Sequence, residues 1–447
     1  MNMLDIILAK RYKEELNDEQ IHYFIQGVTT KTIPDYQIAS LLMAIVLNGM
    51  TEREMTYLTL EMARSGEVLD LSYIPGTKVD KHSSGGVGDK CTLIVLPIVA
   101  SLGVPIVKLS GRGLGFTGGT IDKLESIRGF RTSIPVADFE KRLAESGMVL
   151  SGQTPELAPA DKVLYALRDV TGTVESIPLI ASSIMSKKIA GGADAIVLDV
   201  TCGAGAFMKN ETSARELARA MIQIGSIANR PVTCVISSME QPLGRAVGNA
   251  LEIKEAMDVV NGKGPEDTVE VSLTLAAAML MRSDIGRGRS FAECFAMARQ
   301  AIDSGKAAVA FRRFITGQDG EVSDGLPVFV ETPVLRDVLT APNDGYLSGL
   351  HAQRIGEASM LLGAGRRKKE DAIDMGAGIL LSAKVGDYVR RGDVIAELFT
   401  GSSSTISEAA MKEAKERAYS AYSFSTKRPD VPKEILAVLD ETILKNE

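Results

Sequence analysis

The sequence has few of the residues that build disulfide or metal sites. Only four cysteines and three histidines occur among 447 residues, and no Cys-x-x-Cys pair is present. We therefore expect four reduced thiols in or near the core and no histidine-rich metal cluster. No apolar run reaches the roughly 18 residues of a membrane span, and the N-terminus lacks the basic-then-apolar order of a signal peptide. These absences predict a cytoplasmic protein that does not insert into a membrane.

An excess of positive charge is also missing. The net charge is −7, which gives no general attraction to nucleic acid, so any phosphate binding must be local. Hydrophobic residues make up 45% of the chain and charged residues 24%, a balance that allows a sizeable buried core. The length predicts about two or three domains. We find no internal repeat or low-complexity segment.

A first glycine-rich loop lies in residues 78–89, which read Lys-Val-Asp-Lys-His-Ser-Ser-Gly-Gly-Val-Gly-Asp. We expect a short strand to run into a loop that carries Lys81, His82 and Ser83. Small residues let backbone N–H groups converge on an anion, while the lysine and serine add a charge and hydroxyl donors. Neither a P-loop nor a clean dinucleotide turn is present. The segment predicts a phosphate site, with an ordinary loop as the alternative.

A second glycine-rich loop follows the apolar run at residues 104–107. Residues 108–120 read Lys-Leu-Ser-Gly-Arg-Gly-Leu-Gly-Phe-Thr-Gly-Gly-Thr and open into a predicted helix with Thr120 near its cap. A strand, a glycine loop and a helix N-terminus form an anion site, to which the helix dipole contributes. With Lys108 and Arg112, the two loops predict one shared phosphate pocket. Two unrelated tight turns are the alternative.

Hydrophobic patterns divide the chain into helical and α/β stretches. Residues 1 to about 66 read as helices, with capping boxes at Asn17 and Thr51. From about 76 to 155, short apolar strands alternate with helical stretches, which is typical of an α/β layer. Residues 159–191 return to helix.

The two loops resemble those of the thymidine and pyrimidine-nucleoside phosphorylases. The shared pattern is Asp-Lys-His-Ser-x-Gly-Gly-Val-Gly-Asp, then Ser-Gly-Arg-Gly-Leu-Gly-x-Thr-Gly-Gly-Thr-x-Asp-Lys-Leu-Glu. The resemblance continues through residues 153–154, 159–162, 165–171, 176–188 and 361–366. It covers most of the chain, and the order and spacing of so many motifs make it specific.

The resemblance implies reversible phosphorolysis, in which inorganic phosphate attacks the anomeric carbon of a pyrimidine nucleoside and releases the base. The positions that hold phosphate in similar proteins match Lys81, Ser83, Thr92, Lys108, Ser110 and Thr120. Those that grip the base match Arg168, Ser183 and Lys187. We expect His82, Arg168 and Lys187 to be catalytic, because cations stabilise a departing base anion and a histidine can donate a proton. The alternatives are solvated helix charges and a histidine that only hydrogen-bonds its loop.

The patterns and the resemblance together predict an α/β fold with three parts. A helical domain accompanies a larger α/β domain with a central sheet and a C-terminal α+β domain with a barrel-sandwich-like part. Because no lysine lies at the tip of a matching hairpin, we interpret that part as structural rather than as a carrier. The expected ranges are 1–66 with 159–191, 70–158 with 192–330, and 335–447. The residues that bind the base and those that bind the phosphate then lie on different domains, and closure of these domains should bring the two sets together.

The resemblance implies phosphate as co-substrate, no other required cofactor, and a homodimer. Some relatives also hold a monovalent cation such as potassium, at positions that match Gly88, Lys90, Leu243, Ala246 and Glu255. Relatives usually have a hydroxyl side chain at the second of these positions. This chain has Lys90 there, and its ammonium could occupy the cation site instead. The sequence leaves open which cation occupies it.

Two departures from the family pattern concern the substrate. Phe116, which we expect to contact substrate, stands where histidine is usual, and Thr201 and Cys202 replace the start of Lys-x-Gly-x-Gly-Ala-Phe-Met. They put base and sugar preference in doubt. Two other functions stay open: a phosphoribosyltransferase of the same fold, and a catalytically weakened binding or regulatory relative.

Overall fold

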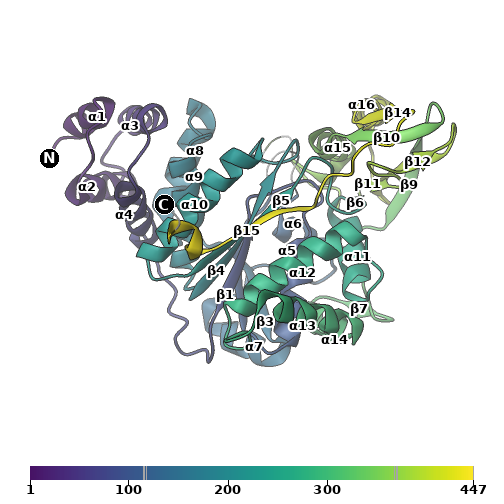
Figure 1. Ribbon diagram of the computed structural model, residues 1–447, viewed down its shortest axis with the longest axis horizontal. Helices are drawn as coiled ribbons and strands as arrows, with labels where there is room; N and C mark the ends of the chain where they lie inside the picture. Colours follow the sequence, from purple (N-terminus) through teal and green to yellow (C-terminus); the bar gives the residue numbers. More distant parts are fainter. Residues whose placement is uncertain (114–115, 117, 367, 369–370, 446–447) are drawn as a thin grey trace.

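The computed structural model describes residues 1–113, 116, 118–366, 368 and 371–445. A helical part lies at one end of the long axis, a C-terminal part at the other, and an α/β part between them (Figure 1). No helix in the described part of the chain is long and apolar enough to cross a membrane.

The helical part combines two segments that lie far apart in the sequence. Its helices are α1 (Met3–Arg11), α2 (Asp18–Thr29), α3 (Asp35–Asn48), α4 (Glu52–Arg64), α8 (Pro159–Thr171) and α9 (Ile177–Ala190). The predicted capping boxes at Asn17 and Thr51 are confirmed, because each side chain accepts from the third helical N–H, and the side chain of that third residue accepts from the backbone N–H of the cap residue. Leu41, Leu164 and Leu179 share one buried apolar cluster. This cluster fixes α8 and α9 against the first four helices.

The α/β part is built on a four-stranded sheet of order β1-β4-β5-β15. The strands are β1 (Val79–Ser83), β4 (Ala195–Cys202), β5 (Val232–Ser238) and β15 (Ile435–Leu439). The first three are parallel, and β4 and β5 are buried along their whole length, as parallel strands covered on both faces must be. A separate parallel pair joins β2 (Ile106–Ser110) to β3 (Met148–Gly152).

The last strand of this sheet comes from the C-terminal tail. We expected residues 335–447 in the C-terminal domain, whereas residues 435–439 form β15 and pair antiparallel with β5. Figure 1 shows this strand in yellow, crossing back over the α/β part. The pairing covers a sheet edge that would otherwise expose unpaired backbone groups.

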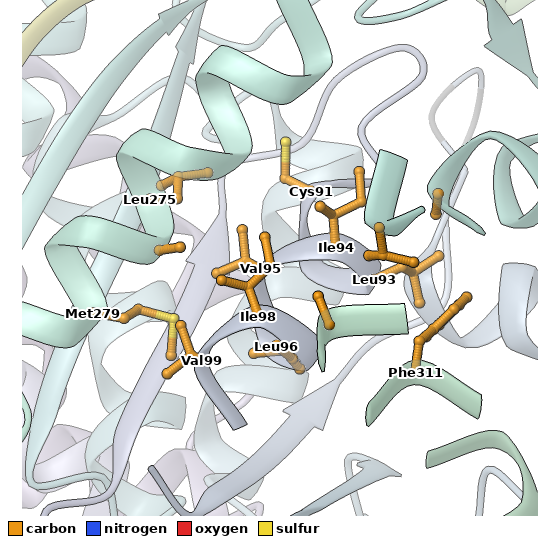
Figure 2. Packing of buried hydrophobic residues seen from close by; sticks show 14 of the residues in the cluster. Cys91, Leu93, Ile94, Val95, Leu96, Ile98, Val99, Leu275, Met279 and Phe311 are labelled. Atoms are coloured by element: carbon orange, nitrogen blue, oxygen red, sulfur yellow. The ribbon is translucent and has the colours of Figure 1, made fainter. Parts of the chain in front are cut away.

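Helices surround the sheet and supply its core. They are α5 (Cys91–Ser101), α6 (Thr120–Glu125), α7 (Phe139–Ser146), α10 (Glu211–Ile227), α11 (Asn249–Val260), α12 (Glu266–Met281), α13 (Phe291–Asp303) and α14 (Lys306–Gly317), with a 3₁₀ turn η1 (Val136–Asp138). In Figure 2, Val95 and Ile98 of α5 lie beside Leu275 and Met279 of α12. Consistent with the prediction, all four cysteines are buried and unpaired.

The C-terminal part contains two small sheets, of order β12-β10-β14 and β6-β11-β13-β9. Their strands are β6 (Ala246–Val247), β9 (Pro333–Thr340), β10 (Gly345–Leu350), β11 (Gly378–Leu381), β12 (Tyr388–Val389), β13 (Val394–Gly401) and β14 (Tyr422–Ser425). The remaining elements are the hairpin β7 (Val322–Ser323) and β8 (Leu326–Pro327), α15 (Ala352–Ser359), η2 (Met360–Ala364), α16 (Glu408–Tyr419) and η3 (Glu441–Lys445). Because β6 belongs to the α/β segment of the chain but pairs with β11, it connects the two parts.

Candidate active site

The first predicted phosphate residues lie on a strand. We expected Lys81, His82 and Ser83 in the glycine-rich loop, and this is wrong, because the parallel ladder with β4 continues until Ser83 faces Asp199. The loop begins only at Ser84. A strand holds these three side chains more rigidly than a loop would, on alternating faces of the sheet.

Lys81 is a buried cation with unused hydrogen-bonding capacity. Its Nζ lies 3.5 Å from the Thr92 hydroxyl and 3.7 Å from a carboxylate oxygen of Asp199. Burial alone would lower the pKa of Lys81, but Asp89 and Asp199 outweigh it and raise that pKa. An ammonium has three donors, and these two contacts are long. Lys81 is therefore charged at neutral pH and has donors left for an anion.

Lys108 shares a carboxylate with a second lysine. Asp80 lies 3.4 Å from the Nζ of Lys108 and accepts a hydrogen bond of 2.8 Å from Lys188. Burial lowers the pKa of Lys108 to about 7, and the neighbouring charge of Lys188 adds to the effect while Asp80 opposes it. Sequence reasoning missed Asp80 and Lys188, although both lie inside the matched motifs. A buried lysine requires an acidic partner, and this requirement was the signal that could have led to both residues.

The other phosphate residues lie at the ends of elements. Thr92 is in the first turn of α5, Ser110 ends β2, and Thr120 begins α6. Lys123 of α6 donates to the backbone oxygen of Asp89 at 2.6 Å and holds the helix start near the loop before α5. Within the described residues, Ser110 and Thr120 make no side-chain hydrogen bond to the other phosphate residues. Among the predicted phosphate residues, the structure thus joins Lys81 directly to Thr92.

The predicted base residues lie on the paired helices α8 and α9. The Nζ of Lys187 donates to Asp161 at 2.6 Å and to the Ser183 hydroxyl at 3.0 Å. Asp161 was not predicted as a site residue, although it lies in a matched motif. It balances the lysine charge and sets the direction of the side chain.

Arg168 is buried, with 2% of its surface exposed, so the alternative of a solvated helix charge is wrong for this residue. Its guanidinium donates to the backbone oxygens of Thr173, Leu179 and Val174 at 3.1, 3.1 and 2.6 Å. Burial lowers its pKa, but a guanidinium remains charged at neutral pH. The side chain therefore fixes the turn between α8 and α9 and retains two of its five N–H donors.

His82 lies in the electrostatic field of lysines from both groups of residues. Burial holds its pKa well below the usual value, and Lys188, Lys108, Lys187 and Lys81 lower it further. The four lysines come from β1, β2 and α9. The imidazole is therefore neutral at neutral pH, which suits a hydrogen-bond donor near the leaving base better than a cationic acid.

Phe116 faces the C-terminal part of the molecule. A Cβ atom added to Gly356 of α15 would lie 2.9 Å from a methyl group of Val87 and 3.1 Å from the Phe116 ring. The ring also packs against the apolar cluster of the C-terminal part. Its contact with substrate stays a prediction. Leu114, Gly115 and Thr117 of the same loop lie outside the described residues.

The second departure, Thr201, connects the end of β4 to the first glycine loop. Its hydroxyl donates to the backbone oxygen of Gly85, and its N–H donates to the Ser84 hydroxyl at 2.9 Å. Cys202 beside it is buried. These contacts give Thr201 a structural task at the edge of the site.

The five residues at which the sequence predicts a cation site also lie together, around the ammonium of Lys90.

Three family descriptions match the chain. Residues 4–66 match "Glycosyl transferase family, helical bundle domain", residues 75–308 "Glycosyl transferase family, a/b domain", and residues 346–420 "Pyrimidine nucleoside phosphorylase C-terminal domain". The crystal structure of anthranilate phosphoribosyltransferase from Thermus thermophilus is 18% identical and superimposes with a TM-score of 0.56 over 70% of this chain and 99% of that chain. This likeness shows a shared fold. The predicted fold class is confirmed.

Curated relatives match nearly the whole chain. The pyrimidine-nucleoside phosphorylase of Staphylococcus haemolyticus is 53% identical over 394 residues, which cover 88% of this chain and 90% of that protein. The pyrimidine-nucleoside phosphorylase of Bacillus subtilis is 51% identical over 401 residues, 89% of this chain and 92% of that protein. Identity at this level over this length confirms the resemblance of the two glycine loops, and the chain belongs to the pyrimidine-nucleoside phosphorylase family.

Proposed function

We propose that this chain catalyses the reversible phosphorolysis of pyrimidine nucleosides or deoxynucleosides, giving the free base and (deoxy)ribose 1-phosphate. The contacts of Asp80 on β1 carry the proposal. This carboxylate lies 3.4 Å from the Nζ of Lys108 and accepts from Lys188 of α9 at 2.8 Å, so the phosphate lysines adjoin the helix that carries Lys187. A phosphate group and a base anion would therefore both find cations within one site. The names of the curated relatives support the same reaction.

The nucleophile is inorganic phosphate, held as a co-substrate on the α/β part. The residues assigned to it are Lys81, Ser83, Thr92, Lys108, Ser110 and Thr120. Their lysines and hydroxyls place the anion against the anomeric carbon, and this positioning lowers the entropic cost of attack.

The leaving group is the pyrimidine base, which departs with its bonding electrons and is negatively charged. Arg168, Ser183 and Lys187 are assigned to it, and the two cations stabilise that charge as it develops. The neutral His82 donates a hydrogen bond on the same side. No other cofactor takes part in this scheme.

A phosphoribosyltransferase is not favoured. Two acidic groups near Lys81, Asp89 and Asp199, both stabilise its charge, so they are poor candidates to hold magnesium for a diphosphate substrate. The transferase from Thermus thermophilus shares only the fold with this chain. A catalytically weakened relative is not favoured either, because Lys81, Arg168 and Lys187 are all present.

The decisive experiment incubates the protein with uridine, deoxyuridine and thymidine, each with and without inorganic phosphate. We expect free base only when phosphate is present. Release of base without phosphate, or no release from any pyrimidine nucleoside, contradicts the proposal. The panel also measures the preference for ribose or deoxyribose.

We further propose a cytoplasmic homodimer. Buried, unpaired cysteines suit a reducing compartment. Tyr12, Tyr36 and Leu47 of the helical part are large, exposed apolar side chains that a second copy could cover. Light scattering coupled to size-exclusion chromatography should give twice the chain mass, and a monomer mass would contradict the dimer.

A further inference from the structure

The ammonium of Lys90 lies at the centre of an oxygen cage. The side chain is buried, with 1% of the residue exposed. Its Nζ donates to the backbone oxygens of Leu243 and Ala246 at 2.8 and 3.1 Å, and to a carboxylate oxygen of Glu255 at 2.7 Å. These are ordinary hydrogen-bond lengths, and an ammonium has three donors. Every donor of Lys90 is therefore used.

The backbone and Glu255 shape this cage independently of the lysine. Gly88 and Gly244 have φ values of +74° and +72°, and a Cβ on Gly244 would lie 2.0 Å from the Glu255 carboxylate. The N–H groups of Arg245 and Ala246 each donate to that carboxylate at 2.9 Å. The acceptors thus converge on a point where a compact cation must lie.

We propose that the Lys90 ammonium is a built-in substitute for a monovalent cation, so that this chain neither binds nor needs potassium at the site. The five residues are those at which the family resemblance places a cation with a hydroxyl at residue 90. In this chain the oxygens are already bonded to an ammonium, and a second positive charge a few ångströms away would be repelled. The residues present therefore do not fit a potassium ion.

The charge balance of the cage agrees with this substitution. The carboxylate of Glu255 lies 2.7 Å from the ammonium of Lys90, and both side chains are buried. A covalently attached cation cannot dissociate, so the cage is filled at any potassium concentration.

The ammonium connects three elements of the fold. Lys90 precedes α5, Glu255 belongs to α11, and Ala246 lies on β6, which pairs with Leu380 of β11 in the C-terminal part. Thr92 of the phosphate set follows two residues after Lys90. The lysine therefore secures the start of α5 to the C-terminal part, which is the structural task that a bound cation would perform.

Lys90→Thr tests the proposal because it returns a hydroxyl and leaves the cage without a charge. Thermal unfolding is measured in potassium chloride and in choline chloride at equal ionic strength. We expect the same midpoint in both salts for the wild-type protein. In choline, the variant should unfold on the order of 5–10 °C lower, as expected for breaking a buried ion pair. Potassium, but not choline, should restore much of that loss.

Lys10→Thr is the matched control. Lys10 is also a buried lysine, bonded to both oxygens of Glu54 at 2.8 and 2.9 Å, but no backbone carbonyl of the described residues accepts from its ammonium. This variant should lose stability equally in both salts. A Lys90→Thr variant that gains no more from potassium than Lys10→Thr does would overturn the proposal.

The wild-type protein tests the proposal even if Lys90→Thr does not fold. A higher unfolding midpoint of the wild-type protein in potassium chloride than in choline chloride would also overturn the proposal. Unfolding does not depend on the proposed function. A turnover assay, which rests on that function, should give equal wild-type rates in the two salts.

Discussion

The buried ammonium of Lys81 on β1 would contact the proposed phosphate. Lys81→Ala removes a preorganised cation and leaves the residues on α8 and α9 in place. Loss of one such donor costs about 2.7–4 kcal/mol in the transition state, so turnover should fall about 10²–10³-fold, with a higher KM for phosphate. Lys78→Ala is the control, since Lys78 precedes the same strand but pairs with Asp194 at 2.9 Å. Equal phosphate kinetics in the two variants would contradict the assignment.

Lys108 predicts a pH dependence of phosphate binding. Because burial lowers its pKa to about 7, the side chain is cationic below that pH and loses its charge as the pH rises through it. The KM for phosphate should therefore rise above about pH 7. Lys108→Arg stays charged throughout, so its KM should vary less with pH. Identical pH profiles for the two proteins would show that the titration belongs to another group, such as phosphate itself.

Lys187 predicts a dependence on the leaving group. A pyrimidine anion that is already stable, such as a fluorinated one, needs less help from a cation than an ordinary one does. Lys187→Ala should therefore slow uridine more than 5-fluorouridine. Equal losses for both substrates would indicate that Lys187 serves only binding or folding, through its contacts with Asp161 and Ser183.

At the scale of elements, local signals were readable from the sequence and long-range partners were not. The caps at Asn17 and Thr51 depend on residues three positions away, and both were predicted. Lys188 and Asp80 are 108 positions apart, so no pattern along the chain could pair them. The extent of β1 was missed for the same reason, because pairing with β4 decides it.

The strand β15 was also missed, and it predicts the behaviour of a truncated chain. Removing residues 431–447 should expose the edge of β5, lower the unfolding temperature and promote aggregation. A truncation after residue 440 keeps the strand but loses η3, including Glu441, which pairs with Arg282 at 2.6 Å, and Ile443 and Leu444, which pack partly buried against an apolar cluster. The shorter deletion should be milder, because that pair is partly exposed and the ladder with β5 is kept. Equal stability of the two truncated chains would show that the contacts of η3, rather than strand pairing, hold the tail.

At the scale of the whole molecule, the two groups of site residues lie on different parts of the fold. Arg168, Ser183 and Lys187 belong to the helical part, whereas Lys81 and Lys108 belong to the α/β part. The two parts are visible side by side in Figure 1. Lys188 of α9 already bridges them through its hydrogen bond of 2.8 Å to Asp80 on β1. This contact lies next to His82, and we expect the two parts to rotate about it when they close.

Closure around both ligands follows from this division. On the proposed assignment each part would hold one reactant, so the two parts should approach when both reactants are bound and should exclude water from the reaction. Small-angle X-ray scattering with phosphate and uracil together, which cannot react without a sugar phosphate, should give a smaller radius of gyration than either ligand alone. Lys81→Ala should respond weakly, because its phosphate site is damaged. An unchanged radius with both ligands bound, as verified by calorimetry, would mean that the site is preformed and that the parts do not move.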